Sequence, residues 1–125
     1  RVRGRFGIRL GCGSATAAGV ELWFDPAQRA AQWRTPRRPE FVLDTEAMPF
    51  RGGDFAILNV EGLDRPFNLD IVMQRDDKSD STIVDAQIDE RRTMITRRTC
   101  FGLDAPITPF AEAGELTCMV IPVHA

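Results

Sequence analysis

The residues that could do chemistry are few, and the best candidates alternate along one short segment. In Val20–Asp25, VELWFD, the side chains of Glu21, Trp23 and Asp25 share one face. An aromatic ring beside carboxylates is typical of sugar-contact surfaces, because the ring packs on the apolar face of a sugar and the carboxylates accept its hydroxyl groups. We therefore predict a candidate carbohydrate-binding surface at Glu21, Trp23 and Asp25. The alternative is that Trp23 packs against another domain or a second sheet.

Catalytic groups are harder to find. A retaining glycosidase needs two carboxyl groups roughly 5 Å apart. Asp70, Asp85 and Asp89 lie on polar strand faces and could converge, but carboxylates on outer strand faces are normally solvated. A Ser/His/Asp site would depend on His124, the sole histidine and the penultimate residue. We therefore predict no catalytic residue and expect that this chain is not an enzyme by itself.

Cysteine and histidine usage argues against a metal centre. The chain has 3 Cys, no CxxC pair and 1 His, so the spacing typical of metal ligands and of a dense disulfide framework is absent. Buried free thiols are the expectation, since a free cysteine behaves as a small apolar residue. A bridge between Cys100 and Cys118 is an alternative if their strands are neighbours. No metal and no cofactor are expected.

Charge and hydropathy narrow the range of partners. With 16 Lys+Arg against 18 Asp+Glu the net charge is -2, so we expect neither nucleic acid nor a membrane as a partner. No apolar run approaches the roughly 20 residues that span a bilayer, and no leader resembles a signal peptide. The compartment, cytoplasmic or secreted, stays open. The chain starts at Arg1 without Met and already inside an alternating pattern, which suggests a piece of a longer protein.

Short alternating segments must position these residues. The stretch Pro66–Arg98 predicts three consecutive antiparallel strands, with a charged first turn at Arg75–Asp80. A strand is also predicted at 1–10, and its arginines, Arg5 and Arg9 among them, are expected on a solvated or domain-facing outer surface. The last strand is predicted at Glu115–Val123, central or sandwiched because both its faces are apolar. Further short strands are expected at 20–25, 31–35, 41–44 and 55–60. Trp33 is expected in the core, and 55–60, which is apolar with little alternation, is expected to be an inner strand covered on both sides.

No segment predicts a helix of three turns. Eight or nine short strands, separated by turns rich in Gly, Pro and Asp, indicate an all-β fold. We expect a two-sheet antiparallel β-sandwich of the jelly-roll or concanavalin-like kind, formed as one domain by residues 1–125.

Several motifs, in order, resemble one known module. They are Val20-Glu21-Leu22-x-Phe24-Asp25, Arg65-Pro66-Phe67-x-Leu69-x-Ile71, Ile83-Val84-Asp85-x-x-Ile88-Asp89-x-Arg91-Arg92-Thr93, Arg97 and Phe110-Ala111-Glu112-x-Gly114-Glu115-Leu116. This pattern resembles the C-terminal β-sandwich of glycoside hydrolase family 32, the invertase, inulinase and levanase group. The resemblance covers the chain from about Phe6 to Val120. The charged turn Arg75–Ser81 is longer than the usual hairpin of that module. Cys100–Pro109, which carries two prolines and is expected to be irregular, also departs from it.

The resemblance implies a role without catalysis in this chain. In that family an N-terminal five-bladed propeller performs hydrolysis, and none of its catalytic motifs can be matched here. The implied function is an accessory C-terminal module of an enzyme that acts on fructans or sucrose, with the propeller as its partner and stabilisation of the propeller as its task. A stand-alone module that binds fructan oligo- or polysaccharides, and an interaction domain with no sugar role, are the alternatives. An exposed apolar patch would favour the first hypothesis, and a small polar pocket with one aromatic wall the second.

Overall fold

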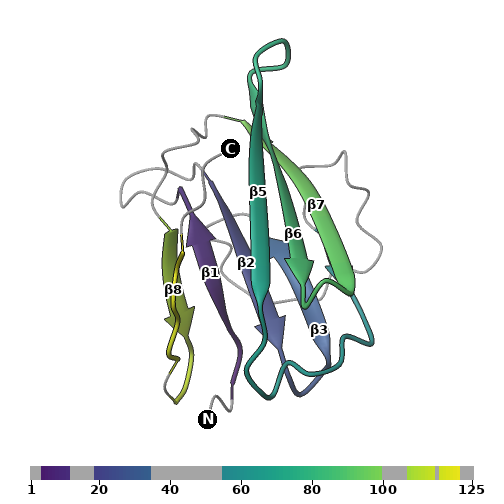
Figure 1. The fold of residues 1–125 in the computed structure, drawn as a ribbon, viewed down its shortest axis with the longest axis vertical. Helices are drawn as coiled ribbons and strands as arrows, with labels where there is room; N and C mark the ends of the chain where they lie inside the picture. Colours follow the sequence, from purple (N-terminus) through teal and green to yellow (C-terminus); the bar gives the residue numbers. More distant parts are fainter. Residues whose placement is uncertain (1–3, 12–18, 35–54, 100–106, 115, 122–125) are drawn as a thin grey trace.

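The computed structural model describes residues 4–11, 19–34, 55–99, 107–114 and 116–121. These residues form two antiparallel sheets stacked as two layers, with no helix among them (Figure 1). The predicted all-β, two-sheet antiparallel sandwich is therefore confirmed. The strands are β1 (Phe6–Leu10), β2 (Val20–Asp25), β3 (Ala30–Arg34), β4 (Phe55–Ile57), β5 (Leu69–Asp76), β6 (Ser81–Ile88), β7 (Arg92–Thr99) and β8 (Ile107–Ala111).

The first sheet has five strands in the order β4-β3-β2-β1-β8. Strands β1 to β4 are neighbours in sequence order, whereas β8 returns from the far end of the chain to pair with the free side of β1. Gly7 pairs with Trp23 on one side and with Phe110 on the other. The return of β8 therefore brings an aromatic side chain beside the candidate residues of β2.

The second sheet is the expected meander, with the order β5-β6-β7. The β5–β6 hairpin projects beyond the rest of the sandwich at the top of Figure 1. The turn from β6 to β7 is closed by a hydrogen bond from the Arg91 N–H to the Ile88 carbonyl, 2.9 Å long. Its central residues, Asp89 and Glu90, have φ of 51° and 60°. Aspartate tolerates such an angle, as asparagine and glycine do, so the cost of this turn falls mainly on Glu90.

The core lies between the two sheets, where the apolar faces predicted by strict alternation meet. Every second residue of β1, β2 and β6 points inward because successive side chains of a strand lie on opposite faces. Trp33 is fully buried, as its place in β3 predicts. The buried apolar set also includes Phe6, Ile8, Leu10, Val20, Leu22, Phe24, Ala31, Val60, Leu63, Val84, Ala86, Ile88 and Met94.

The sequence prediction for the last strand is wrong. The last strand was expected within 115–123 and in a central place, but residues 116–121 form no strand, and Met119 and Ile121 are exposed. The strand that completes the five-stranded sheet is instead β8, in a stretch that Pro109 marked as irregular. Pro109 is tolerated because β8 is at the edge of the described sheet, where a missing N–H costs no ladder bond.

The prediction for 55–60 is also wrong. This segment was expected to be an inner strand covered on both sides, yet β4 occupies the other end of the described five-stranded sheet.

Cys118 is a free, exposed cysteine, so it is neither a buried thiol nor half of the bridge with Cys100. Cys100 itself and the strand expected at 41–44 lie outside the described residues, as does His124. Across the part that the structure describes, no helix is long and apolar enough to cross a membrane.

Candidate functional site

The predicted site lies on the outer face of the five-stranded sheet, where it belongs to a larger cluster of arginines and aromatic rings. We call Arg5, Arg9, Trp23, Arg34 and Phe110 the arginine–aromatic cluster. The rings of Trp23 and Phe110 meet edge to face with their centroids 4.8 Å apart. The Arg9 guanidinium lies 4.2 Å from the Phe110 ring centroid. Contacts of this kind are stabilising because the negative face of the aromatic ring attracts the charge of the guanidinium group.

Trp23 is the centre of this cluster. The guanidinium carbons of Arg5 and Arg34 lie 5.4 Å and 5.1 Å from its ring centroid. The strand register places Arg34 toward the Glu21 end of β2 and Arg5 toward the Asp25 end, so the two cations approach the ring from opposite ends of the strand. Arg34 is itself almost fully buried, with 2% of its surface exposed. The ring is thus packed into the protein and does not stand as an open platform.

The two predicted carboxylates are also engaged within the protein. Glu21 accepts a hydrogen bond of 2.7 Å from Arg9 Nε and one of 3.2 Å from Trp23 Nε1. Asp25 accepts a bond of 3.1 Å from the Gln28 N–H and thereby closes the turn between β2 and β3. Each carboxylate residue is only 7% exposed. The structure therefore brings Glu21 and Trp23 into contact and directs Asp25 to a turn, and sugar binding at these residues stays a prediction.

Gly7 makes this packing possible. It lies in β1 between Trp23 and Phe110. A Cβ atom at this position would come within 1.9 Å of the Leu22 carbonyl oxygen and 3.1 Å of the Phe110 ring. Only glycine leaves the strands and rings enough room here.

A second polar location was not foreseen from the sequence. It is an open hollow of about 460 Å³ at the β6–β7 turn, and it is lined by Glu61, Gly62, Arg65, Pro66, Asp89 and Arg91. Two motifs quoted for the family resemblance, one at 65–71 and one at 83–93, supply most of its lining. No sequence pattern indicates that these two motifs meet, because their contact depends on the path by which the chain enters β5. No aromatic residue belongs to the described lining.

The carboxylates of the hollow are held as anions. The Arg91 guanidinium donates to Glu61 and, over 3.1 Å, to Asp89. A hydrogen bond from its own backbone, followed by the charges of Arg91 and Arg92, lowers the pKa of Glu61 below its ordinary value. The Asn68 N–H and then Arg91 lower the pKa of Asp89 in the same way. A glycosidase acid needs a raised pKa to carry a proton at neutral pH, so neither group suits that role.

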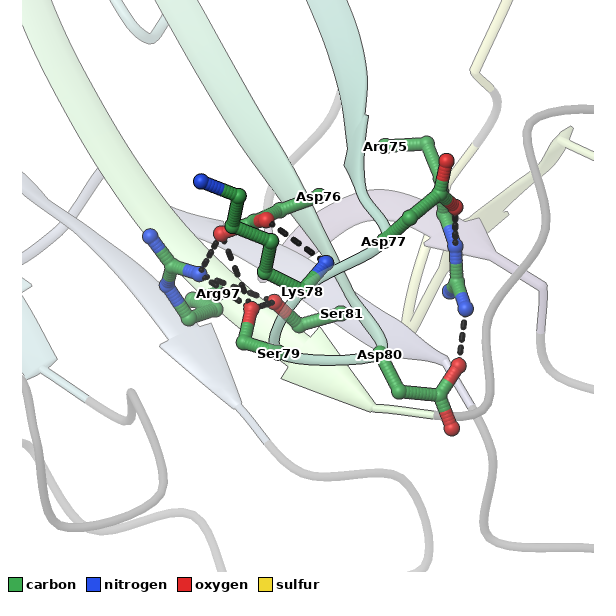
Figure 2. A network of polar contacts seen from close by, with 8 residues as sticks. All are labelled: Arg75, Asp76, Asp77, Lys78, Ser79, Asp80, Ser81 and Arg97. Carbon is green, nitrogen blue, oxygen red and sulfur yellow. Dashed lines mark hydrogen bonds and ion pairs between the residues drawn. The ribbon is translucent and has the colours of Figure 1, made fainter.

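The third polar cluster is the β5–β6 hairpin. Arg97 on β7 donates from Nη1 to Asp76, Ser79 and Ser81 over 2.8 Å, 2.8 Å and 2.9 Å (Figure 2). The hydrogen bonds that Asp76 accepts, first from Arg97 and then from the Ser79 hydroxyl, lower the pKa of Asp76. At the other side of the loop Arg75 binds Asp80. The charged turn is therefore ordered by its own side chains, which explains how a hairpin of this length is stable.

Asp70, Asp85 and Asp89, considered above as a catalytic set, do not form one site. Asp70 and Asp85 lie on the outer face of the three-stranded sheet, in different rows of its register, whereas Asp89 lies in the β6–β7 turn. Within the described ranges no three His, Cys, Asp or Glu side chains are grouped to hold a metal ion.

Comparisons of the chain with protein-family models, with curated proteins and with solved structures give no match.

Proposed function

We propose that this chain is a non-catalytic accessory module of a glycoside hydrolase that acts on fructans or sucrose, and that it packs against the catalytic propeller and stabilises it. The family comes from the ordered resemblance of the motifs between Phe6 and Val120. The accessory role is supported by one structural observation above all: the segment at 116–121 exposes Met119, Val120 and Ile121 by 84%, 53% and 72%.

Three consecutive exposed apolar side chains are unusual on a free surface and are typical of a surface that another protein covers. The segment carries no charge and forms no strand of its own, although Leu116 at its start packs against the core. Covering the three exposed side chains with a neighbouring domain would remove apolar surface from water, at roughly 25 cal/mol per Å². An exposed apolar patch of this kind favours the accessory hypothesis over the alternatives.

The test is the thermal unfolding of the catalytic propeller, alone and with this chain added. A partner that binds only the folded propeller raises its melting temperature as the concentration of the chain increases. We expect such a rise with the native chain and a smaller one with the triple variant Met119→Ser, Val120→Ser, Ile121→Ser. A variant with Leu58→Ser, another exposed apolar residue, serves as the matched control. An unchanged melting temperature with the native chain would contradict the proposal.

Carbohydrate binding is the second candidate, and the hollow at Glu61, Asp89 and Arg91 is the observation that favours it. Ionised carboxylates and guanidinium groups are suitable partners for sugar hydroxyls. Arg65, three-quarters exposed at the rim, is the lining residue with most freedom to reach a ligand. Calorimetric titration with levan, inulin and fructose, and with a cellulose oligomer as control, tests it. Saturable binding that is lost in Arg65→Ala would establish this function, and no binding would exclude it.

A further inference from the structure

The hollow at the β6–β7 turn has Gly62 as its floor, and two guanidinium groups face the space above this glycine. A Cβ atom at this position would lie 3.5 Å from Arg91 Nη2 and 3.9 Å from Arg65 Nε. Apart from the chain neighbours of Gly62, no other described residue comes within 4 Å of that point. The two nitrogens are at most 7.4 Å apart, because 3.5 Å and 3.9 Å are measured from the same point.

Arg65 has little to bind within the described part of the chain. The nearest carboxylate is Asp64, 3.9 Å from Arg65 Nε, which is too long for a hydrogen bond, and the Arg65 side chain is 75% exposed. Arg91 instead divides its charge between Glu61 and Asp89. Two like charges that face the same point repel each other, and an anion bound between them relieves this repulsion. The charges around Gly62 therefore favour an anionic group.

The loop that carries Gly62 is held in place on both sides. Val60 and Leu63 are 1% and 4% exposed and belong to the core. Arg92 fixes the start of the loop by hydrogen bonds of 2.8 Å and 2.9 Å to two backbone carbonyls. Gly62 itself has φ of 82°, an angle that favours glycine and keeps the floor open. The cradle is thus formed before any ligand binds, which lowers the entropic cost of binding.

The carboxylates of the same hollow narrow the class of ligand further. Glu61 and Asp89 have lowered pKa values and are ionised at neutral pH, so they only accept hydrogen bonds. They repel a bare anion but bind the hydroxyl groups of a sugar. The volume of about 460 Å³ is at the lower end of the range for small-molecule pockets. A single sugar ring with one charged substituent matches both the size and the charges.

We propose that this hollow binds a monosaccharide that carries an oxyanion, either a carboxylate or a phosphate. The oxyanion lies above Gly62 and accepts from Arg65 and from the N–H of Arg91 Nη2 that Asp89 does not use. With hydrogen bonds of about 2.8 Å on each side, two oxygens of one oxyanion span the gap between these nitrogens. The ring hydroxyls donate to Glu61 and Asp89. This proposal is independent of the accessory role, and it differs from the fructan candidate because neutral fructans carry no oxyanion.

NMR titration of the chain at low ionic strength tests this proposal, with the Nε–H signals of Arg65 and Arg91 as the readout. The probes are fructose 6-phosphate and glucuronate, which separate the two oxyanions. Fructose is the neutral control and inorganic phosphate the control without a sugar. We expect saturable shifts with at least one charged sugar, and affinities about tenfold weaker or less for both controls.

Each other outcome contradicts a defined part of the proposal. Equal affinity for fructose would overturn the oxyanion and would support the fructan candidate instead. Equal affinity for inorganic phosphate would overturn the sugar, because the hydroxyl groups would then contribute nothing. No saturable shift with either charged sugar would overturn the proposal as a whole and would leave the accessory role untouched.

Two matched pairs of variants locate the site. Arg65→Gln should weaken binding of the charged sugar about fivefold, as the loss of one exposed charged contact. Arg75→Gln removes the same charge in the hairpin at the other end of β6 (Figure 1) and should leave the affinity within about twofold. Equal losses in these two variants would mean unspecific attraction and would overturn the site.

The second pair tests the cradle itself. Gly62→Ala places a methyl group where the oxyanion lies and should remove the shifts at Arg65 and Arg91. Gly114→Ala introduces a side chain at a similar φ, 81°, outside the hollow, and should leave binding unchanged. Unchanged binding by a folded Gly62→Ala chain would contradict the position of the oxyanion. If that variant does not fold, the pair at Arg65 and Arg75 decides alone.

Discussion

The outer face of the five-stranded sheet holds Arg5 and Arg34 against the Trp23 ring, whereas the outer face of the three-stranded sheet leaves Val72 and Ile95 open to solvent. Both faces combine charged and apolar side chains. On the first, each carboxylate has its donor and each ring has its cation within the chain. On the second, the buried Oδ1 of Asp85 has no donor among the residues that the structure describes.

This difference indicates separate roles for the two faces. Residues whose interactions are complete within the chain contribute to folding, and their replacement lowers stability. Residues whose interactions are incomplete contribute little to folding or oppose it, so their replacement should leave stability unchanged or raise it. The composition of a face does not distinguish these cases, and only the register and the hydrogen bonds do.

The largest effect is expected for Gly7→Ala on the closed face. The added methyl group would lie within 1.9 Å of the Leu22 carbonyl oxygen, so β1 and β2 must separate and the Trp23–Phe110 contact must open. We expect a loss of about 3 kcal/mol in the free energy of unfolding, measured by urea denaturation. Gly4→Ala is the control, because its methyl group meets Ala113 and Glu112 atoms only at 3.6 Å and beyond. Equal effects of the two variants would show that the cluster does not depend on Gly7.

A smaller effect of opposite sign is expected for Asp85→Val on the open face. The change removes the unsatisfied carboxylate oxygen and completes a row of β-branched side chains with Val72 and Ile95. The monomer should become more stable by about 1 kcal/mol, measured at low protein concentration. A destabilised Asp85→Val chain would mean that Asp85 contributes to folding and that the contrast between the faces is wrong.

The smallest effect concerns the hairpin at the end of the open face. Arg97 lowers the pKa of Asp76 from its ordinary value of 3.8. A carboxyl group whose pKa is lowered by folding stabilises the protein above its unfolded pKa, and this contribution is lost as the pH falls through the folded pKa. In Arg97→Gln the pKa of Asp76, followed by carboxyl carbon NMR, should rise toward 3.8. An unchanged pKa would exclude Arg97 as the cause.

Alternation of side chains was enough to predict the sandwich, the meander and the burial of Trp33. Alternation gave wrong predictions for two segments that do not alternate, residues 116–121 and β8. Residues 116–121 are apolar on both sides, a pattern that fits a buried strand and an exposed docking segment equally well. β8 was missed because Pro109 argued against a strand, and an edge position that tolerates proline is not visible in a sequence.

The candidate site was predicted in part. The parity of Glu21, Trp23 and Asp25 placed them correctly on the outer face, but it could not reveal their partners. Arg5 and Arg9 were expected on a solvated or domain-facing strand surface, and they instead contact the rings of Trp23 and Phe110. Which side chains meet across strands depends on register and on the return of β8, and both are set by tertiary packing.

Trp23→Ala, assayed for both stability and fructan affinity, is the most direct test of the central claim that the arginine–aromatic cluster serves folding and not sugar binding. The account predicts a loss of about 2 kcal/mol in the free energy of unfolding, since a half-buried ring and its contacts with Arg5, Arg34 and Phe110 are removed. It predicts identical calorimetric titrations with levan and inulin for the native and variant chains. An unchanged melting temperature together with weaker fructan binding would contradict it.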